Sequence, residues 1–217
     1  MHDLVIRGAE VADGSGAPLR MADVAVSDGR ITEVGRVGGA AKQSVDGSGL
    51  VLSPGIVDVH THYDAQLTWD SNATPSPALG VTTVVVGNCG FSIAPCPPEC
   101  RDLIARNLAE VEGMSLTALR SGTNWEFESF AEYLTLLKRK GVTPNVAAFI
   151  GHSAVRTMVM GDEASARAAN DDEVAAMRDL VVGGMDAGAV GFSTSTSINH
   201  YGDGGVPMPS RLAEESE

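Results

Sequence analysis

The stretch PGIVDVHTH, residues 54–62, is the most informative part of the chain. Its apolar run, residues 56–59, predicts a buried β-strand that is introduced by a proline and a glycine. Because side chains alternate along a strand, His60 and His62 point to the same side at its C-terminal end. Two imidazoles on one side can bind a single metal ion together. We therefore expect a metal site at the end of this strand.

The composition of the chain limits the binding partners that such a site can have. The chain has 217 residues and 43% hydrophobic content, so it can bury a substantial core in one or two domains. Its formal net charge of -13 repels phosphate backbones and anionic lipid, so neither nucleic acid nor membrane is an expected partner. The N-terminus lacks a signal-peptide pattern, and three sparse cysteines argue against a disulfide framework. A cytoplasmic location is expected.

Two kinds of pattern divide the chain. Residues 1–52 contain short β-like runs separated by Gly, Asp and Ser turns, among them Asp28-Gly29, which predicts a small β-sandwich-like domain. In residues 53–217, helical patterns alternate with short apolar runs. This pattern is typical of buried parallel strands joined by helical crossovers. This alternation is typical of the α/β class. The strands are expected at residues 56–59, 82–86, 145–150 and 189–192.

Helix boundaries are readable between these strands. Ser129 and Glu132 form a capping-box pattern ahead of an apolar face, and three basic residues precede Gly141 at the other end. Another helix is expected to begin near Asn170 and to end at Gly188. In a (β/α)8 barrel the C-terminal strand ends would share one face, although periodicity alone does not separate a barrel from a doubly wound sheet.

Polar residues at the expected strand ends supply the candidate site, namely His60, His62, Cys89, His152 and Ser193. The sequence around them resembles the amidohydrolase superfamily, whose members hydrolyse amide or ester bonds at one or two metal ions. Residues 54–62 are similar to its first barrel strand. GVTTVVVGNCG at 80–90 resembles the D-aminoacylase branch, as do GHSAVR at 151–156 and GAVGFSTS at 188–195. The resemblance covers essentially the whole chain.

This resemblance implies a fold, a metal and a substrate. The fold would be a partial TIM-like (β/α)8 barrel of about four β/α units, preceded by the small β-domain. His60, His62 and Cys89 would bind one or two Zn²⁺ ions, a metal that suits imidazole and thiolate. The reaction would be the hydrolysis of a linear amide bond in an N-acyl-D-amino acid, with the metal polarising the carbonyl and a carboxylate acting as general base.

Three further residues are candidates for contacts with the substrate or the ligands. Asp64 stands where related cyclic-amide hydrolases place an arginine for the substrate carboxylate, and its acidic side chain does not suit that use. His152 can orient a ligand, although an ordinary strand-end hydrogen bond fits equally. Ser193 can line the site or simply cap the next element. Cys96 and Cys100 are interpreted as loop thiols rather than as a second metal pair.

The length is short for this fold. A full barrel takes about 250 residues, whereas about 160 remain after the β-domain, so half of the barrel is expected to be missing. The resemblance places two more histidine ligands and the general-base aspartate beyond Glu217, and His200 lies in a loop that fits no ligand position. Residues 209–217 are expected to begin a helix. A separate C-terminal half or a homo-oligomer would cover the unpaired strand edge.

Three functions remain compatible with the sequence. The first is a zinc-dependent amidohydrolase that deacylates N-acyl-D-amino acids and needs the missing half. The second is a non-catalytic metal-binding remnant that keeps the first ligands without a general base. The third is a cyclic-amide hydrolase of the dihydropyrimidinase or dihydroorotase type, which the cysteine of the GNCG turn disfavours.

Overall fold

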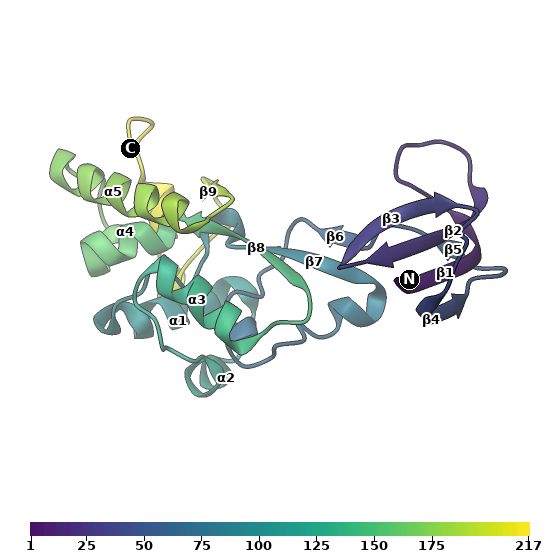
Figure 1. The fold of residues 1–217 in the computed structure, drawn as a ribbon. Coiled ribbons are helices and arrows are strands. Elements are labelled where there is room, and N and C mark those ends of the chain that lie inside the picture. The colour runs from purple at the N-terminus through teal and green to yellow at the C-terminus, as the bar shows by residue number, and fades with distance from the viewer. The chain divides into compact units, whose positions relative to one another are not determined.

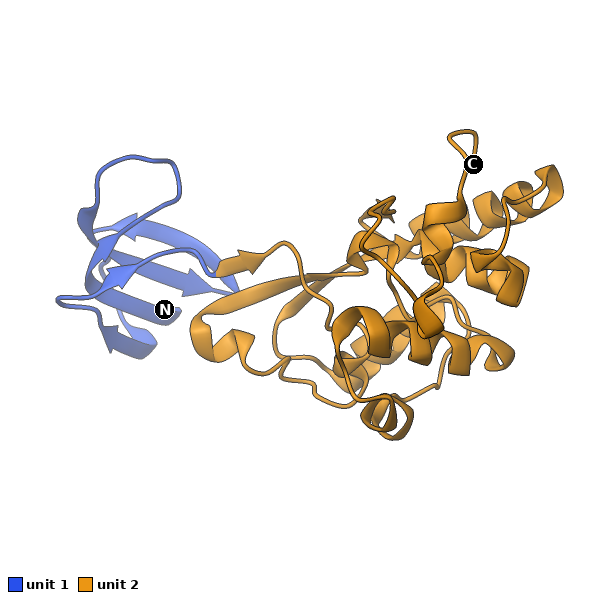
Figure 2. Cartoon of the chain, turned by 180° about the vertical axis from the view of Figure 1, so that it is seen from behind, with its two compact units in different colours: residues 1–55 blue, residues 56–217 orange.

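The computed structural model describes residues 1–217, which divide into two compact units, Met1–Gly55 and Ile56–Glu217 (Figure 2). The division falls within the PGIVDVHTH stretch, after its proline and glycine. None of the helices combines the length and the apolar character needed to cross a lipid bilayer.

The first unit is one five-stranded sheet (Figure 1). Its strands are β1 (His2–Val11), β2 (Arg20–Ser27), β3 (Arg30–Gly35), β4 (Ala41–Asp46) and β5 (Val51–Leu52). The order is β3-β2-β1-β4, and β5 pairs with the end of β1. The predicted tight turn at Asp28-Gly29 is confirmed, because both residues have positive φ and join β2 to β3.

The strands of this unit pair through its longest strand. The long strand β1 pairs with β2 along one edge and with both β4 and β5 along the other, so all five strands join one sheet. A bulge between Ile6 and Ala9 interrupts the regular pairing with β2. Its buried apolar residues form two small clusters, one around Val5 and one around Val11.

The second unit contains four parallel strands whose order in the sheet follows their order in the chain. They are β6 (Ile56–Asp58), β7 (Val81–Val86), β8 (Asn145–Gly151) and β9 (Gly191–Ser193). Strand β9 begins later than predicted, because the N–H of Ala189 still bonds to Gly184 O at the end of the preceding helix, across Gly188 with φ of 111°. The unit is therefore a mixed α/β arrangement built on a parallel sheet.

Five α-helices connect and flank these strands (Figure 1). Both predicted helix starts are confirmed as capping boxes, one formed by Ser129 with Glu132 and the other by Asn170 with Glu173. The predicted helix start at residues 209–217 is wrong, since only a 3₁₀ turn forms at Pro209–Leu212. The helices are α1 (Arg101–Glu112), α2 (Leu116–Gly122), α3 (Phe130–Lys140), α4 (His152–Met160) and α5 (Asp171–Ala187).

The core of the second unit lies between the sheet and the helices. Val84 and Val86 of β7 are buried in it, together with Ala148 and Ile150 of β8, and they pack with apolar residues of α1, α3 and α5. Val85 and Phe149, which alternate with them along the two strands, are half-buried. Because successive side chains of a strand point to opposite faces, helices cover one face of the sheet and leave the other accessible.

Candidate metal centre

The three predicted metal ligands come together where β6 and β7 end. The ligand atoms of His60, His62 and Cys89 all lie within 4.8 Å of one another. Cys89 Sγ is 3.3 Å from His60 Nε2, and the two imidazole centroids are 5.2 Å apart. Zinc bonds of about 2.0 Å to nitrogen and about 2.3 Å to sulfur place neighbouring donors about 3 to 4 Å apart. The set therefore fits a zinc ion in both donor chemistry and spacing.

The backbone of the GNCG turn directs the thiol toward this point. Gly87, Cys89 and Gly90 have φ values of 77°, 56° and 78°, so the chain passes through the left-handed region. Glycine is required at position 87, because a Cβ there would lie 2.2 Å from the carbonyl oxygen of Phe149. Cys89 has no such freedom, and its conformation costs about 1–3 kcal/mol. Strain of this kind concentrates at functional sites.

Side chains from neighbouring segments hold the turn in place. Ser193 Oγ accepts a hydrogen bond from the N–H of Gly90 at 3.0 Å and donates one to the carbonyl oxygen of Gly87. Asn88 Nδ2 donates to Thr61 O at 3.1 Å and to a carbonyl oxygen of β7 at 2.9 Å. Ser193, predicted as a site-lining or capping residue, thus contacts the backbone on both sides of the cysteine.

The other two predicted site residues lie outside the ligand set. Asp64 is 3% exposed, its carboxylate accepts the backbone N–H of Gly87, and burial raises its pKa to about 7. His152 is the first residue of α4; its Nδ1 is 2.8 Å from Thr194 Oγ1 and its Nε2 is 2.9 Å from Glu217 Oε1. Burial lowers the pKa of His152. Asp64 therefore supports the turn, while His152 links three segments.

Two open clefts flank the ligand set. One has a volume of about 370 Å³ and is lined by His62, Cys89 and His200 among others, and the second has about 390 Å³ and includes His60. Both clefts share His62 and Glu112. Volumes of this order admit a small molecule. The ligand set is thus open to solvent and to a substrate from two sides.

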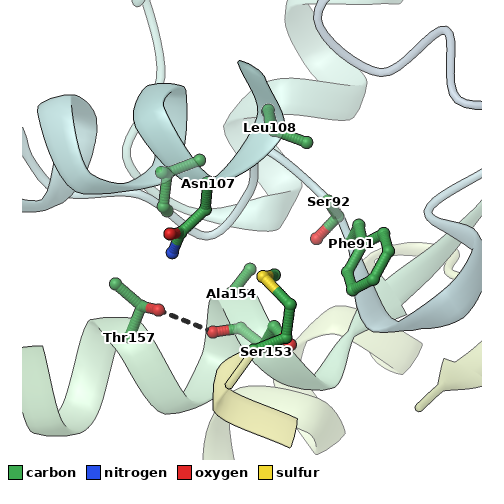
Figure 3. Close-up of a pocket in the computed structure, with 9 residues that line it drawn as sticks. Phe91, Ser92, Asn107, Leu108, Ser153, Ala154 and Thr157 are labelled. Atoms are coloured by element: carbon green, nitrogen blue, oxygen red, sulfur yellow. Dashed lines mark hydrogen bonds between the residues drawn. The ribbon is translucent and has the colours of Figure 1, made fainter. Parts of the chain in front are cut away.

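A third pocket lies behind the site, between α1 and α4 (Figure 3). It has a volume of only about 20 Å³, which is room for about one water molecule. Its lining includes Phe91 and Leu108, and Thr157 Oγ1 beside it donates to Ser153 O at 2.7 Å. The Thr157 hydroxyl is therefore already bonded within α4, and the pocket is too small for a substrate.

Two residues near the ligands were not predicted to belong to the site. Glu112, the last residue of α1, places Oε1 3.1 Å from His62 Nδ1. Burial raises the pKa of Glu112 to about 7, and burial, with the charge of His60, lowers the pKa of His62 to about 4. His200 lines the first cleft, with Nδ1 2.9 Å from Ser195 Oγ. The sequence signal for Glu112 is a carboxylate at a helix C-terminus, which the helix dipole disfavours.

Residues 43–216 match the model of the amidohydrolase family. The chain belongs to this family. The chain is 43% identical over 197 residues to D-aminoacylase of Alcaligenes xylosoxydans xylosoxydans. The match covers 88% of this chain and 37% of that relative.

Two solved amidohydrolase structures extend the comparison. One is N-acyl-D-glutamate deacylase from Bordetella bronchiseptica, complexed with zinc and a phosphonate inhibitor, at a TM-score of 0.79 and 32% identity. The other is a D-aminoacylase with a binuclear metal center, at a TM-score of 0.78 and 35% identity. Each match covers 99% of this chain and 41% of the solved chain. The chain thus spans about two fifths of the length of the relatives it matches.

Proposed function

We propose that this chain carries the zinc-binding part of an amidohydrolase that deacylates N-acyl-D-amino acids, releasing a carboxylate and a free D-amino acid. The observation that carries this proposal is the convergence of His60, His62 and Cys89 to within 4.8 Å. The similarity to D-aminoacylase and to N-acyl-D-glutamate deacylase supports the choice of substrate. A cyclic amide lacks comparable support, since the match to allantoinase of Escherichia coli covers 38% of this chain.

We further propose that residues 53–217 form the first part of a (β/α)8 barrel and that residues 1–52 form the accompanying β-domain. The four parallel strands in consecutive order agree with about four β/α units. The accessible face of the sheet would then be the barrel interior, covered by further barrel strands or by a second copy. Val57, which alternates away from the buried face, is 52% exposed and would be covered in this way.

His60, His62 and Cys89 would hold one or two zinc ions. His60 and His62 would supply neutral imidazoles and Cys89 a thiolate, and bound zinc would supply a Lewis acid that polarises the scissile carbonyl. The lowered pKa of His62 keeps that ring neutral near pH 7, as metal binding requires. Burial raises the pKa of Cys89, so its proton must leave when the metal binds. The general-base aspartate stays a prediction for the sequence beyond Glu217.

The test is the zinc content of the purified 217-residue chain, measured together with turnover of N-acetyl-D-amino acids. We expect stoichiometric zinc, lost in Cys89→Ala and kept in Cys100→Ala, a buried thiol outside the ligand set. Turnover is expected once a C-terminal part of the barrel supplies the general-base aspartate. Zinc without turnover even after that part is supplied would favour the metal-binding remnant. Turnover of a hydantoin or dihydropyrimidine alone would favour the cyclic-amide hydrolase. A chain that binds no zinc would contradict the proposal.

A further inference from the structure

We propose that Glu112 is a positioning residue of the metal centre, whose carboxylate holds the Nδ1 side of His62 and leaves Nε2 for the ion. This inference rests on the proposed function, because it assumes that His62 is a metal ligand. It adds a residue from α1 to a site otherwise built from strand ends.

The contact between the two side chains is close and shielded. Glu112 Oε1 lies 3.1 Å from His62 Nδ1, and the two side chains are 16% and 24% exposed. The two atoms are not aligned as a hydrogen bond, and the buried His62 Nδ1 has no other partner. An imidazole binds an ion through one ring nitrogen, and a carboxylate on the other nitrogen fixes both tautomer and ring orientation. His60 already presents its Nε2 to Cys89 Sγ, so both histidines would offer the same atom.

Glu112 has no other structural role that accounts for its position. It forms no ion pair with a lysine or arginine, whereas Asp102 at the start of the same helix pairs with two arginines. It is the last residue of α1, where the helix dipole disfavours a negative charge. A shielded carboxylate without a cation is costly. The arrangement becomes favourable when a cation occupies the neighbouring ligand set.

The negative charge of Glu112 and its position in both clefts agree with this role. Glu112 lines both clefts beside the ligands, so an ion entering from either side passes near its carboxylate. It does not belong to the group of atoms within 4.8 Å of one another, which distinguishes it from the ligands themselves. The Cys89 thiolate and the Glu112 carboxylate together carry two negative charges. These two negative charges balance the two positive charges of one zinc ion that is bound by two neutral imidazoles.

The experiment compares zinc binding and stability in Glu112→Ala, Glu112→Gln and Glu110→Gln variants of the 217-residue chain. Zinc affinity is measured by competition with a chromophoric chelator, and thermal unfolding is measured on the metal-free protein. We expect Glu112→Ala to lose about 10–100-fold in zinc affinity, as partners of metal-bound histidines typically do. Glu112→Gln should lose less, because its amide oxygen can still accept the Nδ1–H bond. The metal-free Tm should stay constant or rise, because an unfavourable carboxylate is gone.

Glu110 is the matched control, because it is exposed, lies on the same helix, carries the same charge and lines the first cleft, whereas the ion pair with His62 is made by Glu112. Its glutamine variant should bind zinc within about twofold of the parent, since removing a solvated charge changes little. An equal loss in Glu110→Gln, or unchanged affinity in Glu112→Ala, would overturn the inference. His60→Ala and Cys89→Ala are measured in parallel. If these two also leave zinc binding unchanged, the proposed metal site itself fails; if they abolish it while Glu112→Ala does not, only the role of Glu112 fails.

Discussion

Replacing Gly87 with alanine tests whether the GNCG turn is held by its backbone contacts. Two costs add at this position. An L-residue in the left-handed region costs about 1–2 kcal/mol. The new Cβ would also lie 2.2 Å from the carbonyl oxygen of Phe149, and the structure must shift to relieve that overlap. Overpacking typically costs about 1–3 kcal/mol, so Gly87→Ala should lower the free energy of unfolding by about 2–5 kcal/mol.

Gly113→Ala separates the two costs. Gly113 has φ of 61°, close to the 77° of Gly87, but a Cβ there would meet nothing within 4 Å. Its variant should therefore lose only about 1–2 kcal/mol. Urea unfolding followed by circular dichroism gives both values. Equal losses in the two variants would refute the reasoning, because the contact with Phe149 would then contribute nothing. Gly87→Ala should also weaken zinc binding, since the shifted turn carries Cys89.

Three further outcomes follow from burial and charge. In the native protein without bound metal, Cys89 should be the one thiol that reacts with a disulfide reagent. Cys96 and Cys100 are 0% and 6% exposed, and burial raises the pKa of Cys96 to about 12. Reaction of two thiols before unfolding would contradict this prediction. Arg156→Met should cost about 3–5 kcal/mol in urea unfolding, because it leaves the buried Glu217 carboxylate without a cation; a loss below 1 kcal/mol would count against a paired role. Hydrogen bonding to Arg167 lowers the pKa of Glu173 to about 2, so its contribution to stability is present above about pH 4.5 and is lost as the pH falls toward 2. Thermal unfolding of Glu173→Gln should accordingly depend less on pH over that window than unfolding of the parent.

The features that sequence predicted correctly depend on local spacing. Strand β6 ends at Asp58, so His60 and His62 follow the strand instead of alternating along it, although their ligand atoms do lie within 4.8 Å of one another. The capping box of Ser129 with Glu132 was readable because the two bonded residues are three positions apart, and the helix start near Asn170 was also predicted. The family resemblance added Cys89, and the structure brings its thiol to the two histidines. Local spacing, however, could not show which sheet edge each strand of the first unit would occupy.

Local patterns were enough to predict the alternation of strands and helices, the closeness of His60 to His62, and the glycines that permit the GNCG turn. These follow from side-chain period, capping and backbone sterics, which act between near neighbours. The contacts of Ser193 with the turn around Cys89 and of Glu112 with His62 became visible in the folded chain alone. Both contacts join segments far apart in the chain, and they arise from how α1 and β9 pack around the strand ends. Packing of this kind depends on the whole core, so no local pattern encodes it.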